Sequence, residues 1–112
     1  MLECEMRNGH PWSVGGMLPG PTGEDAALLA DLTAEEQEKV LDWIRTMLKP
    51  TRTPYKDRTS YGIKHILEQD TGIYVSNNQF KDAMLVCGFT PIKINELNWV
   101  FCICRNSPAF KR

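Results

Sequence analysis

The stretch that decides the fold is SYGIKHILEQDTGIYVSNNQFKDAMLVCGFTPIKINELNWVFCIC, residues 60–104. In its first two parts the apolar residues recur every three to four positions, as they do on helices, and in its last part they alternate, as they do on strands. Gly72 and Gly88 separate the three parts. The predicted order is therefore helix, short connection, helix and a pair of strands.

The first helix of this stretch is expected to run from Ser60 to Gly72. Ser60 is a suitable N-cap, because its hydroxyl accepts from a free backbone N–H of the first turn. Ile63, Ile66 and Leu67 form one apolar stripe. Gly72 should end the helix, because glycine enters the left-handed conformation without steric cost.

The second helix carries the strongest local signals in the chain. Ser76 and Gln79 have the spacing of a capping box, and Val75 and Phe80 that of a hydrophobic staple. Gly88 should close the helix. Its apolar stripe consists of Phe80, Ala83, Met84 and Cys87. The residues that this register turns away from the stripe are Asn77, Asn78, Lys81 and Asp82.

Two strands should follow, over residues 89–94 and 99–104, because both segments are rich in β-branched and aromatic residues. Residues 95–98 have the composition and length of a hairpin turn. Pro91 has no N–H for a ladder, so the first strand should be an edge strand or begin late. Trp99, Phe101 and Ile103 share one face, which should cover the helices.

This order resembles a winged helix-turn-helix domain over about 45 residues, from Ser60 to Cys104. The residues that carry the resemblance are Gly72-Ile73-Tyr74-Val75-Ser76, Phe80, Met84 and Gly88, with the hairpin after them. The candidate wing, residues 95–98, is short and has no Lys or Arg, in departure from the pattern. The resemblance implies a mainly α fold with a small β-hairpin (α+β), built from three main helices and a C-terminal two-stranded hairpin.

The third main helix should precede this stretch. Thr33 and Glu36 form a capping box, and Pro50 stops the helix. Its apolar stripe is Val40, Leu41, Ile44, Met47 and Leu48. A short helix is expected after Thr22. The predicted core of the fold is Leu41, Ile44, Leu48, Ile63, Ile66, Leu67, Phe80, Met84, Trp99, Phe101 and Ile103.

The chain divides into an irregular Gly/Pro-rich arm, residues 1–23, and a single compact domain, residues 24–112. Trp12 and its apolar neighbours should dock on this domain, or else on a partner. The C-terminal residues 105–112 are expected to fray. The N-terminus has no apolar core of a signal peptide and no run has the length of a membrane span, so we expect a cytoplasmic protein without a membrane partner.

Charge is distributed unevenly along the chain, although the total is only −1. Residues 1–48 hold three Lys/Arg and nine Asp/Glu, and residues 49–112 hold ten Lys/Arg and five Asp/Glu. Such asymmetry indicates either contact with nucleic acid or an acidic partner within the molecule. A solvated surface with chance clustering is the alternative.

Two sets of residues are candidates for DNA contact. On the second helix, Asn77, Asn78 and Gln79 can pair with adenine, and Lys81 can contact guanine or phosphate. A polar helix face in solvent is the alternative. The loop before the first helix of the stretch holds four cations that can bind a phosphate backbone, or simply lie in water. These cations are Lys49, Arg52, Lys56 and Arg58.

Two functions fit these features. The first is a non-enzymatic module that binds duplex DNA, for example a small regulator. The second is a protein-interaction module, accessory or inhibitory, on the same fold. No enzyme is expected, because no nucleophile, base and phosphate loop occur in a recognisable arrangement. No cofactor is expected either, and the sequence does not indicate an oligomeric state.

A bound metal is not expected. Structural zinc sites use paired ligands at C-x₂₋₄-C spacing, and here only Cys102 and Cys104 are close in sequence. Elemental analysis of the purified protein should therefore find no stoichiometric zinc, and a chelator should leave the melting temperature unchanged. One zinc per chain, with destabilisation by the chelator, would contradict the expectation of four free thiols.

Overall fold

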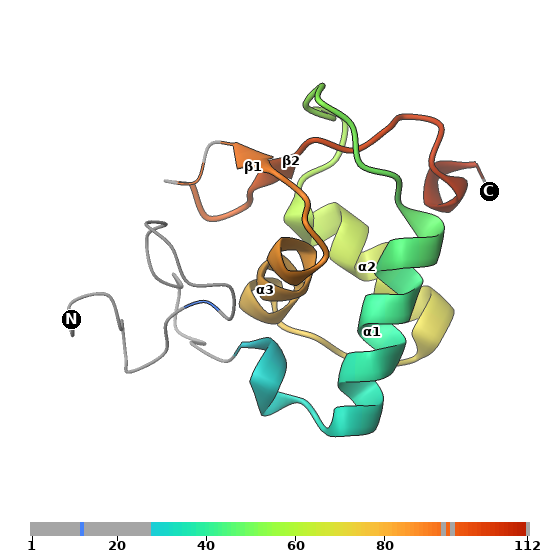
Figure 1. The fold of residues 1–112 in the computed structure, drawn as a ribbon, viewed down its shortest axis with the longest axis vertical. Coiled ribbons are helices and arrows are strands. Elements are labelled where there is room, and N and C mark those ends of the chain that lie inside the picture. Colours follow the sequence, from blue (N-terminus) through green and yellow to red (C-terminus); the bar gives the residue numbers. More distant parts are fainter. Residues whose placement is uncertain (1–11, 13–27, 93, 95, 112) are drawn as a thin grey trace.

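The computed structural model describes Trp12, residues 28–92, Ile94 and residues 96–111 of the 112-residue chain. Within them the fold is mainly helical with a small antiparallel hairpin, as predicted (Figure 1). The elements are η3 (Leu29–Asp31), α1 (Ala34–Met47), α2 (Ser60–Thr71), α3 (Asn77–Val86), β1 (Pro91–Ile92), β2 (Val100–Phe101) and η4 (Pro108–Phe110). None of the helices in the described part is long and apolar enough to cross a membrane.

The helix ends follow the sequence signals. Both capping boxes form: the Thr33 side chain accepts from the Glu36 N–H at the start of α1, and the Ser76 side chain accepts from the Gln79 N–H at the start of α3. Gly72 caps α2 at φ 74°, in the left-handed region where a side chain would be strained. The local signals therefore place each helix boundary within a residue or two.

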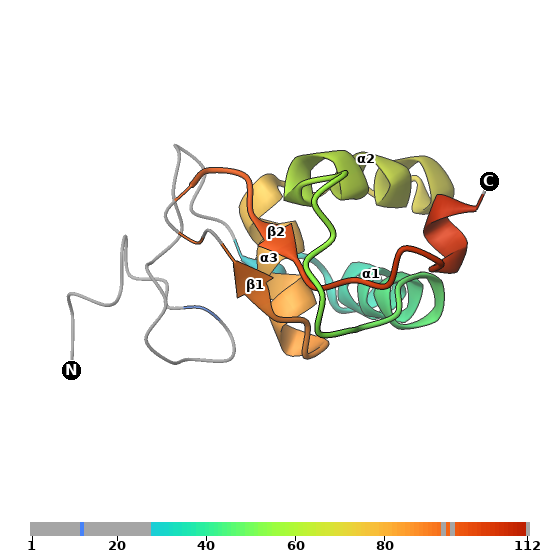
Figure 2. The same ribbon diagram turned by 90° about the horizontal axis from the view of Figure 1, so that it is seen from above.

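The hairpin is shorter than predicted. β1 and β2 pair over two residues each, with Pro91 opposite Phe101. Beyond Phe101 the second segment pairs with the loop after α1, through a bridge between Pro50 and Ile103 and a bond from the Cys104 N–H to the Lys49 carbonyl (2.7 Å). Figure 2 shows this loop running beside β2. The predicted strand 99–104 is therefore shared between two partners.

Ser60 has a different role from the predicted one. Thr59 is the N-cap of α2, and Ser60 is the first helical residue and fully buried. Its hydroxyl donates to Asn77 Oδ1 (2.9 Å) and accepts from the Trp99 N–H (3.1 Å). One serine thus joins the starts of α2 and α3 to the hairpin.

The core agrees with the prediction at every position except one. Leu41 is half-buried, because it lies at the edge of the stripe of α1. The buried residues are Ile44, Leu48, Ile63, Ile66, Leu67, Phe80, Met84, Trp99, Phe101 and Ile103. Val100 and Cys102 are buried as well, so both faces of this segment are covered.

The C-terminal segment is docked, and the prediction that it frays was wrong. Ser107 and Ala109 are fully buried, and the Lys49 N–H donates to Ser107 Oγ (2.9 Å). Phe110 lies against Tyr55 with ring centroids 4.5 Å apart. Apolar contacts therefore fix a segment whose charge and proline suggested a free end.

Trp12 confirms in part the expected docking of the N-terminal arm. It is buried and lies against Trp99, with ring centroids 5.2 Å apart. The other arm residues and most of the short helix expected after Thr22 lie outside the described residues, and η3 follows them.

Phe80 is a direct test of this packing, because it is fully buried at the centre of the core. Truncation to Ala should lower the free energy of unfolding by about 3–5 kcal/mol, through lost burial and the cavity left behind. Urea denaturation measures this. Leu97, which is exposed, is the control, and Leu97→Ala should change stability by about 0.5 kcal/mol at most. Equal small effects at both sites would contradict the register of α3.

Candidate nucleic-acid interface

The polar face of α3 is buried, so the expectation that it points to solvent was wrong. Asn78 is 4% exposed, and Lys81 and Asp82 are fully buried. The Leu29 N–H of η3 donates to Asp82 Oδ2 (2.9 Å), and the Trp99 ring lies 4.6 Å from Lys81 Nζ. Elements distant in sequence therefore cover the face that helical periodicity assigned to solvent.

The other two predicted reading residues of α3 are engaged in the fold. Gln79 Oε1 accepts from the Ser76 N–H (2.9 Å) within the capping box. Asn77 Nδ2 donates to the Leu97 carbonyl (3.1 Å) and to Asn98 Oδ1 (2.9 Å). Asn77 thus anchors the hairpin turn to α3. In this conformation α3 has no exposed set of side chains with which to read bases.

Lys81 is the most unusual charged group of the described residues. Its ammonium is fully buried, lies over the Trp99 ring and has no hydrogen-bond partner among them. Burial lowers the pKa of Lys81 from 10.5 to about 8. A cation–π contact offsets part of the desolvation of an ammonium. Lys81 therefore belongs to the interior of the fold.

The four loop cations lie in a different environment. Lys49, Arg52, Lys56 and Arg58 are all exposed. Their loop is fixed in place, because the Tyr55 N–H donates to the Phe101 carbonyl of β2 and the Thr51 N–H donates to the Cys102 carbonyl just after it. The structure thus keeps the predicted loop set together and separates it from the buried residues of α3.

The C-terminal segment adds two exposed cations to this loop. Arg105 and Lys111 belong to the segment that bonds to Lys49 and packs on Tyr55. We call the joined set the basic surface. The basic surface consists of Lys49, Arg52, Lys56, Arg58, Arg105 and Lys111. Among the described residues of the two segments, Asp57 is the one acidic residue.

Sequence reasoning missed Arg105 and Lys111 because it treated residues 105–112 as a frayed end. The signal that could have found them is Phe110, since burial of a large apolar side chain near a chain end favours docking of that end. In the structure Phe110 lies between Tyr55, with ring planes 19° apart, and Arg58, whose guanidinium carbon is 5.8 Å from the Phe110 ring centroid. This stack holds the two segments together.

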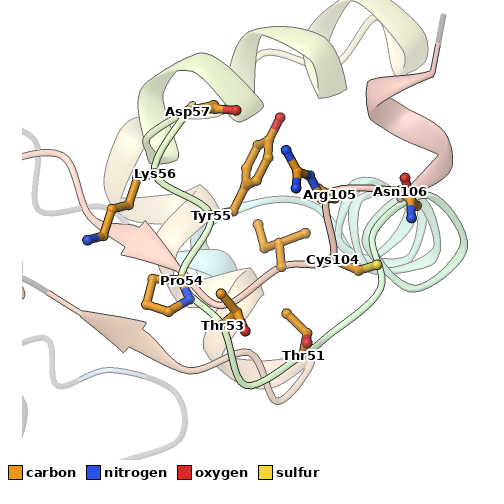
Figure 3. Close-up of a pocket in the computed structure, with 10 residues that line it drawn as sticks. Thr51, Thr53, Pro54, Tyr55, Lys56, Asp57, Cys104, Arg105 and Asn106 are labelled. Atoms are coloured by element: carbon orange, nitrogen blue, oxygen red, sulfur yellow. The ribbon is translucent and has the colours of Figure 1, made fainter.

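A cleft of about 530 Å³ lies between the two segments. Figure 3 shows the Arg105 side chain beside Tyr55, and the Lys56 side chain extending to the other side of the loop. Thr51, Thr53 and Asn106 also line the cleft, so it offers hydroxyl and amide groups between its cations. These are groups that bind phosphate oxygens.

The acidic residues lie at the opposite end of α1. Asp31, Glu35, Glu38 and Asp42 are exposed on η3 and the first turns of α1, whereas Lys49 follows the C-terminal end of α1. These four acidic residues and the basic surface therefore lie towards opposite ends of α1. Such a distribution steers a polyanion towards one side of the molecule.

Glu68 is the centre of a cluster of polar contacts that supports the fold. Glu68 Oε2 accepts from Lys64 Nζ and the Val75 N–H (both 3.1 Å), and Glu68 Oε1 lies 3.3 Å from His65 Nδ1. Burial of Glu68 opposes ionisation, but the Val75 hydrogen bond and Lys64 together lower the pKa of Glu68 below 4.5. The cluster fixes the connection between α2 and α3.

Metal ligands do not gather in the described part of the chain, where no three of His, Cys, Asp and Glu could hold one ion. Cys87, Cys102 and Cys104 are free thiols there. Cys4 and His10 lie outside the described residues.

No family model, no curated protein and no solved structure matches this chain.

The pKa of Lys81 leads to a test of its burial. Between pH 8 and 10.5 the unfolded chain binds more protons at this lysine than the folded chain, so stability should rise with pH in that window. Below pH 8 Lys81 is protonated in both the folded and the unfolded chain, so its contribution to stability no longer changes with pH. Comparison with Lys81→Met isolates the effect of this lysine. In the wild-type protein the free energy of unfolding should rise on the order of 2–3 kcal/mol across the window, and the variant should lack this rise. Urea unfolding at several pH values measures the difference, and identical profiles would contradict a buried ammonium.

Proposed function

We propose that this protein is a non-enzymatic module that binds duplex DNA through its basic surface. The single observation that supports this is the joining of two distant segments, whose described residues carry six exposed cations and one carboxylate, Asp57. Phosphate contacts supply most of the affinity of sequence-independent DNA binding. Because this surface is built on a fixed loop, its cations are already positioned when DNA arrives.

The finer fold proposal is a winged-helix-like domain. The order of α1, α2, α3 and a hairpin supports it, and so does the bridge between Pro50 and Ile103, which adds an extended segment between α1 and α2 to the sheet. The hairpin turn contributes Glu96 and Leu97, both exposed, so it offers no cation at these two positions. We therefore place the proposed DNA contacts on the loop after α1, and not on α3 or the hairpin turn.

This arrangement determines what kind of binding is expected. Phosphate contacts orient a protein on DNA but carry no sequence information. Asn78 and Lys81, two of the predicted base-reading residues, are buried. The proposed module therefore binds duplexes of different sequence with similar affinity.

The second candidate function is a protein-interaction module. The covered polar face of α3 favours it, because a DNA reader needs this face and an interaction module does not. The acidic end of α1 would also suit a basic protein partner. The DNA titration below decides between the two candidates.

The proposal predicts a steep salt dependence. With about four phosphate contacts, the slope of log affinity against log salt for a random-sequence duplex should be roughly −3 to −4. Arg52→Gln should weaken binding to all sequences alike and make the slope shallower by about one. Fluorescence anisotropy at several salt concentrations measures both.

Lys39→Gln is the matched control. Lys39 is an exposed cation on α1, paired with Glu35 and outside the basic surface. Its replacement should leave affinity and slope unchanged. Equal losses for Arg52→Gln and Lys39→Gln would show that net charge alone drives binding. The absence of salt-sensitive binding at low ionic strength would reject the DNA proposal in favour of the protein-interaction one.

A further inference from the structure

The outer side of α2 carries two exposed aromatic rings that the basic surface does not use. Tyr61 is 50% exposed and Tyr74 is 75% exposed. They come from different elements, since Tyr61 is in the first turn of α2 and Tyr74 is in the connection to α3. Large aromatic rings exposed to this extent are typical of binding surfaces.

Both rings are held by one cation. Lys64 Nζ lies 5.2 Å from the Tyr61 ring centroid and 5.3 Å from the Tyr74 ring centroid. Lys64 is itself 4% exposed and fixed by Glu68 Oε2 at 3.1 Å. The His65 ring adds an edge contact to Tyr61, with centroids 4.4 Å apart. We call Tyr61 and Tyr74 the tyrosine pair. Because the rings are held before any ligand arrives, binding costs little side-chain entropy.

The tyrosine pair follows the loop of the basic surface along the chain. Arg58 lies two residues before α2 begins at Ser60, and Tyr61 is in the first turn of α2. The guanidinium of Arg58 lies over Phe110, which stacks on Tyr55. Along the chain, aromatic residues are therefore interspersed with cations from Tyr55 to Tyr74, of which Lys56 and Arg58 are exposed and Lys64 is buried.

Alternating rings and cations are the arrangement with which proteins bind single-stranded nucleic acid, where bases stack on rings and cations hold the phosphates. In a duplex the faces of the bases are covered by neighbouring base pairs, so the rings have no partner there. Glu68, the carboxylate that holds Lys64, is paired with the Lys64 ammonium, which offsets its repulsion of a phosphate backbone. Stacking accepts any base.

We propose that the tyrosine pair is a stacking site for unpaired bases, next to the phosphate-binding basic surface. This deepens the proposed function, on which it rests, by naming the substrate class: DNA with a single-stranded stretch of a few nucleotides. The basic surface holds the backbone of either form, and the tyrosine pair adds affinity only where bases are open.

The test compares two labelled probes by anisotropy, an oligothymidylate of about 12 nucleotides and a duplex of the same length. The wild-type protein should bind the single strand more tightly. Tyr61→Ala and Tyr74→Ala should each weaken single-strand binding about fivefold or more, the loss of one stacked base. Both should leave duplex affinity and the salt slope within error, because no phosphate contact is removed.

Tyr61→Phe and Tyr74→Phe are the matched controls, since they keep the rings and remove only the hydroxyls. They should retain single-strand affinity within about twofold. Unchanged duplex binding by the Ala variants shows that they are folded. Single-strand binding that survives Tyr61→Ala combined with Tyr74→Ala would overturn the inference alone, and would leave the pair as a surface for a protein. If the wild-type protein binds neither probe at low salt, the inference and the proposed function both fail.

Discussion

One buried hydroxyl group holds this fold together. Ser60 Oγ donates to Asn77 at the start of α3 and accepts from the Trp99 N–H, while the Ser60 N–H donates to the Trp99 carbonyl (2.7 Å). Asn77 in turn bonds the hairpin turn through Leu97 and Asn98. Because Ser60 and Trp99 are both buried, loss of the hydroxyl would leave the Trp99 N–H without a partner and without water. This constraint sets the positions of α2, α3 and the hairpin relative to one another.

The position of Trp99 explains why the predicted DNA-reading face is closed. Once Trp99 is fixed by Ser60, its ring lies over Lys81 and against Trp12, and its Nε1 donates to the Ile94 carbonyl (3.1 Å). The same side chain therefore belongs to the core and covers the outer face of α3. A buried lysine over an indole ring is tolerable because the ring provides part of the electrostatic stabilisation that water would otherwise give.

The basic surface depends on residues 101–104, which bond to the loop after α1 on the side away from β1. Residues after Phe101 bond to the loop after α1, and this pairing places Arg105 near Tyr55 and brings Phe110 between Tyr55 and Arg58. The separation of this surface from the acidic end of α1 gives the molecule one side that favours a polyanion. The tyrosine pair lies on α2 and the connection after it, so the proposed base contacts follow the loop of the proposed phosphate contacts along the chain.

The sequence by itself determined the parts of the protein that depend on neighbours along the chain. Capping boxes at Thr33 and Ser76, the glycine stop at Gly72 and the apolar stripes are local, so the three helices and most of the core were predictable. Only the tertiary structure decided which polar residues face water. Helical periodicity shows which residues oppose the apolar stripe, but it does not show that Trp99 and η3 cover Asn78, Lys81 and Asp82. Likewise, the sequence was enough to predict the loop cations as a set. Arg105 and Lys111 join that set only because hydrogen bonds connect two segments about 50 residues apart in the chain.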